Sequence, residues 1–518
     1  MKLNFIFILL LSCETASAQN SPLYNSLPVG KYAVGFKIIT LTDSSRISRP
    51  EYNYLGEKYT GDRTKKISIH IWYPAEPNTA VRQITFGDYC YNGLLESTES
   101  AISSADKTRE LNGRRSAIER WFEKKISDGE WQNLAQTPML AGINARALQG
   151  KFPLLIGELR VLSTSLTNEI LASNGYVVAM VRSDEYALDT FAEEALCEIP
   201  DMQFAINYLQ KHESVDADKT GTFGFSGSGF AQVLLGMYDY RIKAVADIES
   251  GIYMNGLYQN FSASNYYDPL KLRIPFLHIF SRDLSKEEKY LADFETKTKL
   301  SQRFRLVLNQ PHLHHWDSAC EGYASCIVLQ NRGTEQSNIK KSFEIEEFYL
   351  LNFFNAELKE DATSQKFLAT KPDLGERQPA LWDINTLNAI ARSPNYDEFE
   401  DLVRKKGIDN AMDIFNTTFK NDTSTNLRQG FMMNALGSKF LSEKKNVEAV
   451  AIFKLNTQLH PDDADLFDSL AQAYEASGDK LNMRGASKRV LDILNKKTIL
   501  NDYEKRLKAD AENRMKPV

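Results

Sequence analysis

The chain has 518 residues and is too long for one ordinary domain. Of these residues 42 % are hydrophobic and 25 % are charged, which is typical of folded protein. This composition excludes an intrinsically disordered chain and predicts two domains. The formal net charge of −6, with no basic stripe, argues against nucleic acid and anionic membrane surfaces as main partners. Small molecules and proteins remain as partners.

The N-terminus has the layout of a cleavable secretory signal. Lys2 precedes an apolar run over residues 3–11, and Ala16-Ser17-Ala18 forms a small-residue cleavage site. We therefore expect residues 1–18 to be a signal peptide and the protein to be exported, periplasmic or secreted. The alternative is lipoprotein processing at Cys13. No later segment contains the ~20 apolar residues of a transmembrane helix.

Residues 19–365 are predicted to form an α/β domain that opens with antiparallel strands. Apolar and polar residues alternate over 31–42 and 67–72, the pattern of half-buried strands. Residues 84–148 are richer in helix formers and predict a helical insertion before the next strand. Such an insertion is a place where a lid or substrate cap is built.

The next part of the chain predicts a mostly parallel sheet. Continuous apolar runs occur at residues 152–156, 176–181, 222–225, 244–246, 276–280 and 304–308. Helical stretches alternate with these runs, which indicates buried parallel strands with helices on both faces of the sheet. On such a sheet, functional groups are expected at the C-terminal ends of the strands.

Beyond residue 366 the strand signals stop and helical periodicity takes over. We expect a helical linker over 366–425 and a tetratricopeptide-like domain over 426–518, because the sequence there repeats with a period of 34 residues. Leu436, Gly437 and Phe440 recur as Leu470, Ala471 and Tyr474. The alternative is a plain helical bundle. The repeats predict a surface for a protein partner or for self-association.

The segment Gly224-Phe225-Ser226-Gly227-Ser228-Gly229 lies between an apolar strand and a small-residue helix. This pattern is typical of a nucleophile elbow, in which a tight turn presents a serine hydroxyl and aims the following N–H groups at an oxyanion. Ser228 stands where the commonest form of the motif has glycine. The alternative is an ordinary glycine-rich turn.

A serine nucleophile needs a base and an acid that orients it. Three of the seven histidines, His312, His314 and His315, follow the strand at 304–308. Carboxylates at strand ends are Asp247, Glu249 and Asp283. The histidine cluster lacks the spacing of common zinc sites, so neither a metal nor a cofactor is expected.

Four cysteines remain after removal of the signal. Cys320 and Cys326 are six residues apart, and an oxidising compartment is compatible with a disulfide between them. The other two, Cys90 and Cys197, are widely spaced. We assign no catalytic role to these thiols.

The order serine, carboxylate, histidine along a parallel sheet resembles the α/β-hydrolase fold. Within it, residues 30–330 resemble the secreted platelet-activating-factor acetylhydrolases and dienelactone-hydrolase-like enzymes. The likeness rests on the elbow and on Gly30-Lys31-Tyr32-Ala33-Val34-Gly35-Phe36, Asp43, Arg46, Ile71-Trp72-Tyr73-Pro74-Ala75, Lys151-Phe152-Pro153-Leu154, Leu171-Ala172-Ser173-Asn174-Gly175-Tyr176-Val177-Val178 and Val215-Asp216-Ala217-Asp218-Lys219.

This resemblance implies that the acid follows the strand after the nucleophile, which is Glu249, with Asp283 as the alternative. The base of the family is followed by an aromatic residue and an aspartate. His312, taken with His315-Trp316-Asp317, is the predicted base and His314 is the second choice.

The region expected to complete the oxyanion hole departs from the family. Where the family carries His-Gly, the chain reads Gly157-Glu158-Leu159-Arg160-Val161. We expect the first oxyanion donor to be the N–H of Gly227 and the second to come from Leu159 or Arg160. The sequence thus predicts an exported serine hydrolase that cleaves carboxylic esters, or less readily amides or thioesters. The alternative is an inactive or slow hydrolase fold that acts as a binding or scaffold protein.

Overall fold

The computed structural model describes residues 21–48, 51–52, 55–58, 60, 63–77, 81–91, 103–159, 162–182, 191–211, 214–252, 254, 256–281, 288–310, 313, 315–330, 333–372, 374–375, 377, 379–422 and 425–516. The chain divides into two compact units, Met1–Ala389 and Ile390–Val518. Within the described ranges no helix has the length and apolar character needed to cross a membrane.

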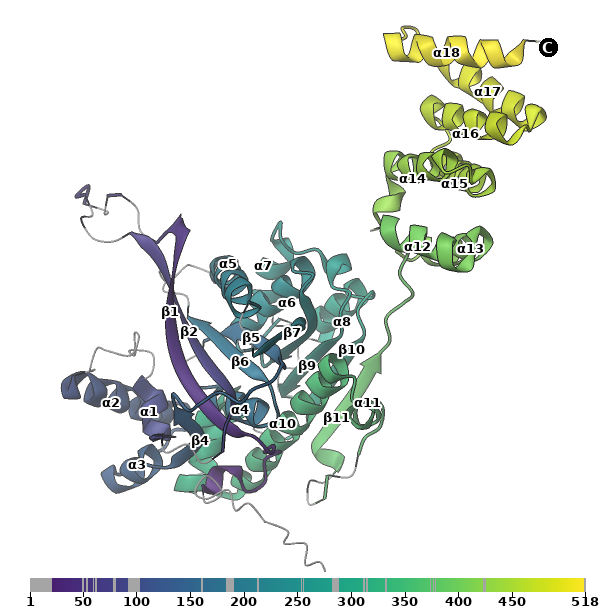
Figure 1. The fold of residues 1–518 in the computed structure, drawn as a ribbon. Helices are drawn as coiled ribbons and strands as arrows, with labels where there is room; N and C mark the ends of the chain where they lie inside the picture. Colours follow the sequence, from purple (N-terminus) through teal and green to yellow (C-terminus); the bar gives the residue numbers. More distant parts are fainter. Residues whose placement is uncertain are drawn as a thin grey trace, which may run out of the picture. The chain divides into compact units, whose positions relative to one another are not determined.

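A mixed sheet forms the centre of the first unit (Figure 1). In spatial order its strands are β11 (Trp382–Leu387), β10 (Arg303–Leu308), β9 (Phe276–Ser281), β8 (Ile242–Ile248), β7 (Val215–Phe225), β5 (Phe152–Glu158), β6 (Val177–Arg182), β2 (Thr64–Ala75), β1 (Ala33–Ile47), β4 (Pro138–Ile143) and β3 (Gln83–Thr85). The six strands from β10 to β6 are mutually parallel. β1 and β2 pair with each other antiparallel, as predicted, and β2 is antiparallel to β6.

Helices cover both faces of this sheet (Figure 1). Because successive side chains of a strand point to opposite faces, Leu155 of β5 packs in one core and its neighbours Leu154 and Ile156 in the other. The first core contains residues of α4 (Ser165–Ser173) and α10 (Gln336–Lys359). The second contains residues of α5 (Phe191–Leu209), α6 (Ser228–Tyr238), α7 (Leu257–Ala263) and α8 (Glu288–Lys297). The predicted fold class, a mostly parallel α/β-hydrolase-type sheet followed by a helical region, is confirmed.

The predicted insertion at 84–148 contains α1 (Phe86–Tyr91), α2 (Ser104–Trp121) and α3 (Asp128–Ala135). Its two ends are strands rather than helices. β3 begins at Gln83 and pairs with β4, which in turn extends the sheet beyond β1. The insertion is therefore attached to the sheet at both of its ends.

The first unit also continues beyond residue 366, where no strand was expected. After α11 (Ala362–Ala369), β11 pairs antiparallel with β10 and closes that edge of the sheet. Trp382, at the start of β11, is fully buried and its Nε1 donates to the Tyr349 hydroxyl at 3.0 Å. This short strand is held by tertiary contacts, which is why its own sequence gave little signal.

The cysteines of the first unit are separate thiols. Cys320 begins α9 (Cys320–Ala324) and Cys326 lies in the π-helical turn at Ser325–Leu329, and both are buried thiols outside any disulfide. A rise of 1.5 Å per residue separates them by about 9 Å along a continuous helical path, which is too far for a disulfide. The disulfide considered in the sequence analysis is therefore not formed.

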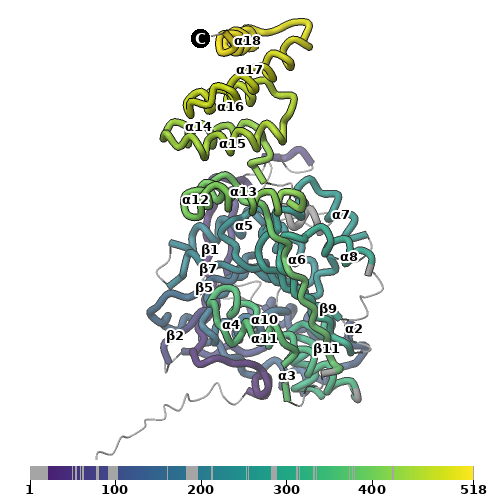
Figure 2. Tube along the Cα trace, turned by 90° about the vertical axis from the view of Figure 1, so that its right-hand side faces the viewer, coloured from purple at the N-terminus to yellow at the C-terminus, as the bar shows by residue number. Residues whose placement is uncertain are grey.

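The second unit consists of helices that pack on one another in sequence (Figures 1 and 2). They are α12 (Tyr396–Lys406), α13 (Ile408–Phe419), α14 (Gly430–Ser442), α15 (Asn446–Leu459), α16 (Ala464–Ser477), α17 (Lys480–Leu494) and α18 (Asp502–Met515). The 34-residue period relates α14 to α16, so that Leu436 and Leu470 are both buried at matching positions. Gly437 is required by packing, because a Cβ there would lie 2.7 Å from the Phe453 ring.

A buried carboxylate, Glu169 of α4, joins four parts of the first unit. Its oxygens accept hydrogen bonds from the hydroxyls of Tyr24 and Tyr89, and from the N–H groups of Leu140 (2.7 Å) and Ala141 (3.1 Å) in β4. Burial raises the pKa of Glu169, and these hydrogen bonds oppose the rise. The carboxylate thus ties α4 to the N-terminal segment, to α1 and to the strand β4.

We expect Glu169→Ala to lower the free energy of unfolding of the first unit by about 3 kcal/mol, because several buried donors lose their acceptor. Glu169→Gln should cost less, since its carbonyl still accepts. Urea unfolding followed by near-UV circular dichroism measures both. The control Asp218→Ala removes an exposed carboxylate of the same unit and should change stability by less than about 0.5 kcal/mol. Equal stability of the Ala variant and this control would contradict the assignment.

Candidate active site

The turn between β7 and α6 carries Ser226 in a left-handed backbone conformation, with φ of 60°. Its N–H donates to the carbonyl of Ile248 at 2.9 Å, and its own carbonyl accepts from the N–H of Gly229 at 3.0 Å. Ser226 is partly exposed, whereas the residues on either side of it are buried. The turn therefore has the geometry of a nucleophile elbow: a strained residue whose side chain is presented beyond the end of the strand.

Two glycines allow α6 to pack closely against the sheet at this turn. A Cβ on Gly224 would lie 2.7 Å from Ser228 Oγ, and a Cβ on Gly229 would lie 2.3 Å from the Cβ of Ser250. Ser228, which replaces the usual glycine, is fully buried, and its hydroxyl donates to the carbonyl of Phe225 at 2.8 Å. The departure from the common motif is therefore accommodated, because the close contact has moved one residue along to Gly229.

The end of the neighbouring strand β8 carries Glu249. Phe225 and Ile248 are partners in the β7–β8 pairing, so Ser226 and Glu249 follow adjacent strand ends. Glu249 also has a positive φ, 50°, and is 2 % exposed. Its Oε1 accepts from the N–H of Ser281 at 2.5 Å, which fixes the carboxylate against the end of β9.

His315 is the described histidine nearest to this carboxylate. It opens the 3₁₀ turn His315–Ser318 after β10, and its Nδ1 lies 3.9 Å from Glu249 Oε2. Its ring stacks on Phe225, the residue before Ser226, with centroids 4.9 Å apart. His312 and His314 lie outside the described residues. The sequence analysis did not select His315 as the base. His315-Trp316-Asp317 nevertheless has the order of histidine, aromatic residue and aspartate that the resemblance implies for the base.

The other carboxylates considered for the acid differ in their surroundings. Asp247 is fully buried and contacts His278 Nδ1 and the Ser250 hydroxyl. These contacts explain Asp247 and His278 as a structural pair within the sheet. Asp283 lies outside the described residues. His70, on β2, is also structural, because burial lowers its pKa to about 3 and keeps it neutral.

The expected oxyanion donors are only partly provided by the described residues. Gly227 directly precedes α6, and the first N–H groups of a helix have no partner within it. The N–H of Leu159, by contrast, donates to the carbonyl of Val181 at 2.8 Å and so belongs to the β5–β6 pairing. Leu159 is therefore occupied as a donor in this structure, and Arg160 lies outside the described residues.

Two further buried carboxylates lie behind the site, on α10. Glu346 and Glu347 are essentially inaccessible to solvent, and the hydroxyl of Thr167 donates to Glu347 Oε1. Burial raises the pKa of Glu346 well above its ordinary value, and the neighbouring Glu347 and Glu249 raise it further. Burial likewise raises the pKa of Glu347 to about 8. Burial therefore favours the neutral, protonated form of both side chains.

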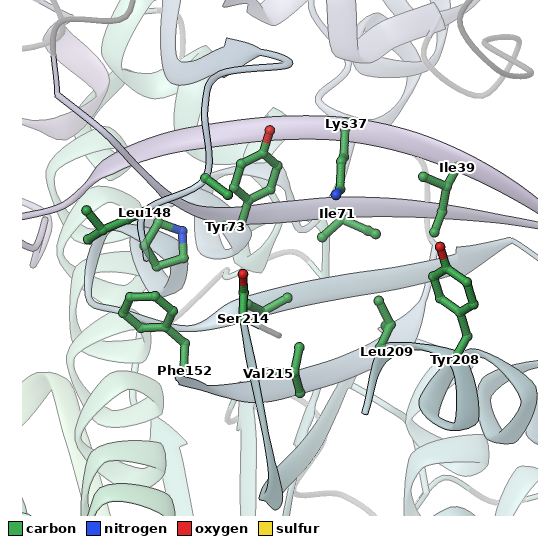
Figure 3. Close-up of a pocket in the computed structure, with 13 residues that line it drawn as sticks. Lys37, Ile39, Ile71, Tyr73, Leu148, Phe152, Tyr208, Leu209, Ser214 and Val215 are labelled. Atoms are coloured by element: carbon green, nitrogen blue, oxygen red, sulfur yellow. The ribbon is translucent and has the colours of Figure 1, made fainter. Parts of the chain in front are cut away.

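An apolar pocket lies at the opposite end of the strands (Figure 3). Its lining includes the start of β7 at Val215 together with Tyr73 and Lys37, whose pKa is lowered by burial. Val215 begins the strand that ends before Ser226, and the pairing of β7 with β5 places the two about eight strand positions, or ~26 Å, apart. This pocket is therefore not where a substrate of Ser226 would bind.

Among the described residues, no group of three or more histidine, cysteine, aspartate or glutamate side chains is arranged to hold a metal ion. The described residues place a hydroxyl and a carboxylate at the adjacent ends of β7 and β8, with an imidazole near the carboxylate from the segment after β10.

Comparisons with known proteins give likenesses to solved structures but no match to a family model or a curated protein. A solved structure of a ferulic acid esterase from Streptomyces cinnamoneus aligns with a TM-score of 0.46 and 16 % sequence identity, over 69 % of this chain and 97 % of the esterase chain. Similarity at this level does not identify a substrate.

The packing at the turn predicts that substitutions at two neighbouring positions destabilise the protein by different amounts. Ser228→Gly should lower the free energy of unfolding by about 1 kcal/mol, because it removes one buried hydrogen bond. Gly229→Ala should cost about 2–3 kcal/mol, because its Cβ meets Ser250, and the added change Ser250→Gly should restore part of the loss. Thermal unfolding of the three variants measures this order. A Gly229→Ala protein as stable as the parent would refute the close contact.

The raised pKa of Glu347 predicts that the protein loses stability as the pH rises. In the folded state its pKa is about 8, against an ordinary value of 4.5, so between these values the unfolded chain releases a proton that the folded protein keeps. The free energy of unfolding should therefore fall with rising pH across this window, by up to about 1.4 kcal/mol per pH unit.

Glu347→Gln should abolish this contribution, because glutamine resembles the protonated acid. The variant should match the parent in thermal unfolding near pH 5 and exceed it near pH 8. The control Glu360→Gln, at an exposed position after α10, should follow the parent at both pH values. Parallel curves for Glu347→Gln and the parent would show that the carboxyl is not buried and neutral.

Proposed function

We propose that the protein is an exported serine hydrolase that cleaves carboxylic esters through an acyl-enzyme. The observation that carries this proposal is the left-handed turn at Ser226 with Glu249 at the adjacent strand end and His315 stacked on Phe225. Serine, acid and histidine in this order at the ends of parallel strands form the triad arrangement of a serine hydrolase. Export is expected from the signal-like sequence at residues 1–18.

In the proposed reaction, Ser226 Oγ attacks the ester carbonyl carbon while the imidazole of His315 takes the hydroxyl proton. Glu249 orients the ring and stabilises the imidazolium. The tetrahedral intermediate then collapses, the imidazolium gives its proton to the leaving alkoxide oxygen, and an acyl-Ser226 ester remains. Water, deprotonated by His315, attacks this ester and releases the carboxylic acid and the free serine.

His315 is favoured as the base because of its two contacts with the site, to Glu249 and to Phe225. The distance of 3.9 Å between Nδ1 and Glu249 Oε2 exceeds hydrogen-bond length, and such contacts often tighten only when substrate is bound. His312 and His314 remain the alternatives. Each would have to reach the same carboxylate from the same strand end.

Oxyanion stabilisation is assigned to the start of α6. The N–H of Gly227 is directed there by the elbow, and the positive end of the helix dipole adds to it. A second donor is expected from residues 160–161, after the strand β5. The second unit is proposed to bind a protein partner, or a second copy of the chain, through tetratricopeptide-like helix pairs.

Fluorophosphonate labelling of the mature protein tests the nucleophile, with peptide mapping to locate the adduct. We expect an adduct on Ser226, and we expect Ser226→Ala to lower hydrolysis of short acyl esters by about 10³-fold or more. His315→Ala should cause a similar loss, and His312→Ala and His314→Ala should each change the rate by less than about 10-fold.

Ser226→Ala with unchanged esterase activity would refute the proposal. A protein that neither reacts with the fluorophosphonate nor hydrolyses esters, but retains a specific protein partner, would favour the alternative of a binding or scaffold protein on a hydrolase fold. Loss of labelling in His312→Ala but not in His315→Ala would reassign the base.

A further inference from the structure

The helix α2 of the insertion contacts the segment that carries His315 at two separate points. The indole of Trp121, the last residue of α2, stacks on that of Trp316 with centroids 3.9 Å apart and planes within 10°. About two turns earlier in α2, Arg114 Nη1 lies 3.2 Å from Oε1 of Glu321, whose side chain is fully buried. The insertion is thus joined to residues 315–321 by a ring stack and by an ion pair.

Trp316 lies between α2 and the candidate active site. Besides Trp121, the ring of Trp316 contacts the ring of His315, with centroids 5.1 Å apart and planes at 81°. It also contacts the ring of Phe225, with centroids 5.8 Å apart. His315 in turn stacks on Phe225, which precedes Ser226. A continuous group of rings therefore runs from the insertion to the imidazole, and each ring limits the rotation of the next.

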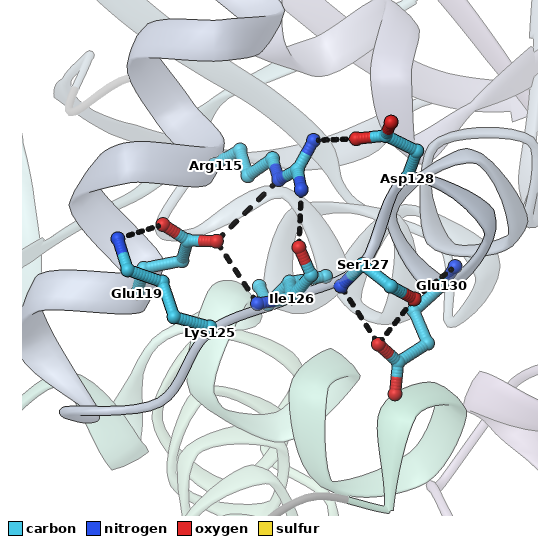
Figure 4. Close-up of polar contacts among 7 residues, drawn as sticks. All are labelled: Arg115, Glu119, Lys125, Ile126, Ser127, Asp128 and Glu130. Atoms are coloured by element: carbon cyan, nitrogen blue, oxygen red, sulfur yellow. Dashed lines mark hydrogen bonds and ion pairs between the residues drawn. The ribbon is translucent and has the colours of Figure 1, made fainter.

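The insertion is itself fixed, as Figure 4 shows for the junction of α2 and α3. Arg115 of α2 donates to the carbonyl of Ile126 and pairs with Asp128 at 2.6 Å, and Glu119 accepts from the N–H of Ile126 at 2.9 Å. Ser127 and Glu130 form a capping box that starts α3.

The second helix of this pair is anchored to the body of the unit. Leu134 of α3 is fully buried, and Trp131 packs edge-on against Phe86 of α1. The sequence analysis expected a lid or substrate cap in this region. These contacts are those of a rigid brace, because both helices are tied to each other and to the core.

We propose that Trp121 is a positioning residue for His315, which it holds through Trp316. The inference rests on the proposed function, since it assigns His315 as the base. A general base works only when it is held close to its productive geometry, and a small displacement lowers kcat more than substrate affinity. The helical insertion would then complete the catalytic site without contributing a catalytic residue.

Trp121→Ala tests this role by the division of its effect between kcat and KM on a short acyl ester. We expect kcat to fall by about 10- to 100-fold and KM to change by less than about 2-fold. Trp121→Phe should retain most of the activity, because a flat ring can still stack on Trp316. The control Arg120→Ala changes the exposed neighbouring residue of α2 and should behave as the parent.

A double-mutant cycle tests the path of the effect. If Trp121 acts through Trp316, the variant Trp121→Ala/Trp316→Ala should be no slower than Trp316→Ala alone. Fully additive losses, or a rise in KM without a fall in kcat, would overturn the inference. Arg114→Gln, which weakens the second contact without touching the rings, should lower kcat in the same direction.

A readout independent of turnover separates this inference from the proposed function. In protein labelled with ¹³C-histidine, the ring signal of His315, assigned from its loss in His315→Gln, should shift in Trp121→Ala and keep its place in Trp121→Phe and Arg120→Ala. An unchanged signal in Trp121→Ala overturns the positioning role. Ester hydrolysis that survives Ser226→Ala would instead refute the proposed function, whatever the histidine signal does.

Discussion

The candidate site depends on two residues held in the left-handed conformation at adjacent strand ends. Ser226 and Glu249 are neither glycine nor asparagine, and a positive φ costs such residues roughly 1–2 kcal/mol each. Their N–H groups donate to Ile248 and Ile279, so each turn is fixed by the strand beside it. Because the turns are fixed by neighbouring strands, the hydroxyl and the carboxylate are presented at the same edge of the sheet.

Buried acid groups lie at and near the same edge. Glu249 is fixed by Ser281, while Glu346 and Glu347 approach from α10 with raised pKa values. Several carboxylates cannot all ionise within a small buried volume, because the charged forms repel each other and lose their hydration. The raised pKa values of Glu346 and Glu347 favour their neutral forms, which limits the negative charge that α10 adds near Glu249.

Much of this arrangement could be predicted from the sequence. Buried apolar runs and their order placed Ser226 and Glu249 directly after strands, and β7 and β8 do end at the preceding residues. The sequence favoured His312, with His314 second, only through the resemblance to a family, because all three histidines follow β10 within seven residues. The contacts of His315 with Phe225 and Glu249 depend on tertiary packing and could not be predicted from the local pattern. The local pattern also missed the edge strands β3 and β11 and the neighbouring strand β4, which are defined by their pairing partners.

The oxyanion region and the helical insertion with α2 and α3 both bear on the proposed catalysis. With the Leu159 N–H bonded to Val181, stabilisation of a developing oxyanion by the described residues falls to the start of α6 alone. One missing donor of this kind costs about 10²–10³ in rate. A general base must also be held close to its productive geometry. The stack of Trp121 on Trp316, supported by the α2–α3 junction, supplies that positioning from outside the catalytic residues.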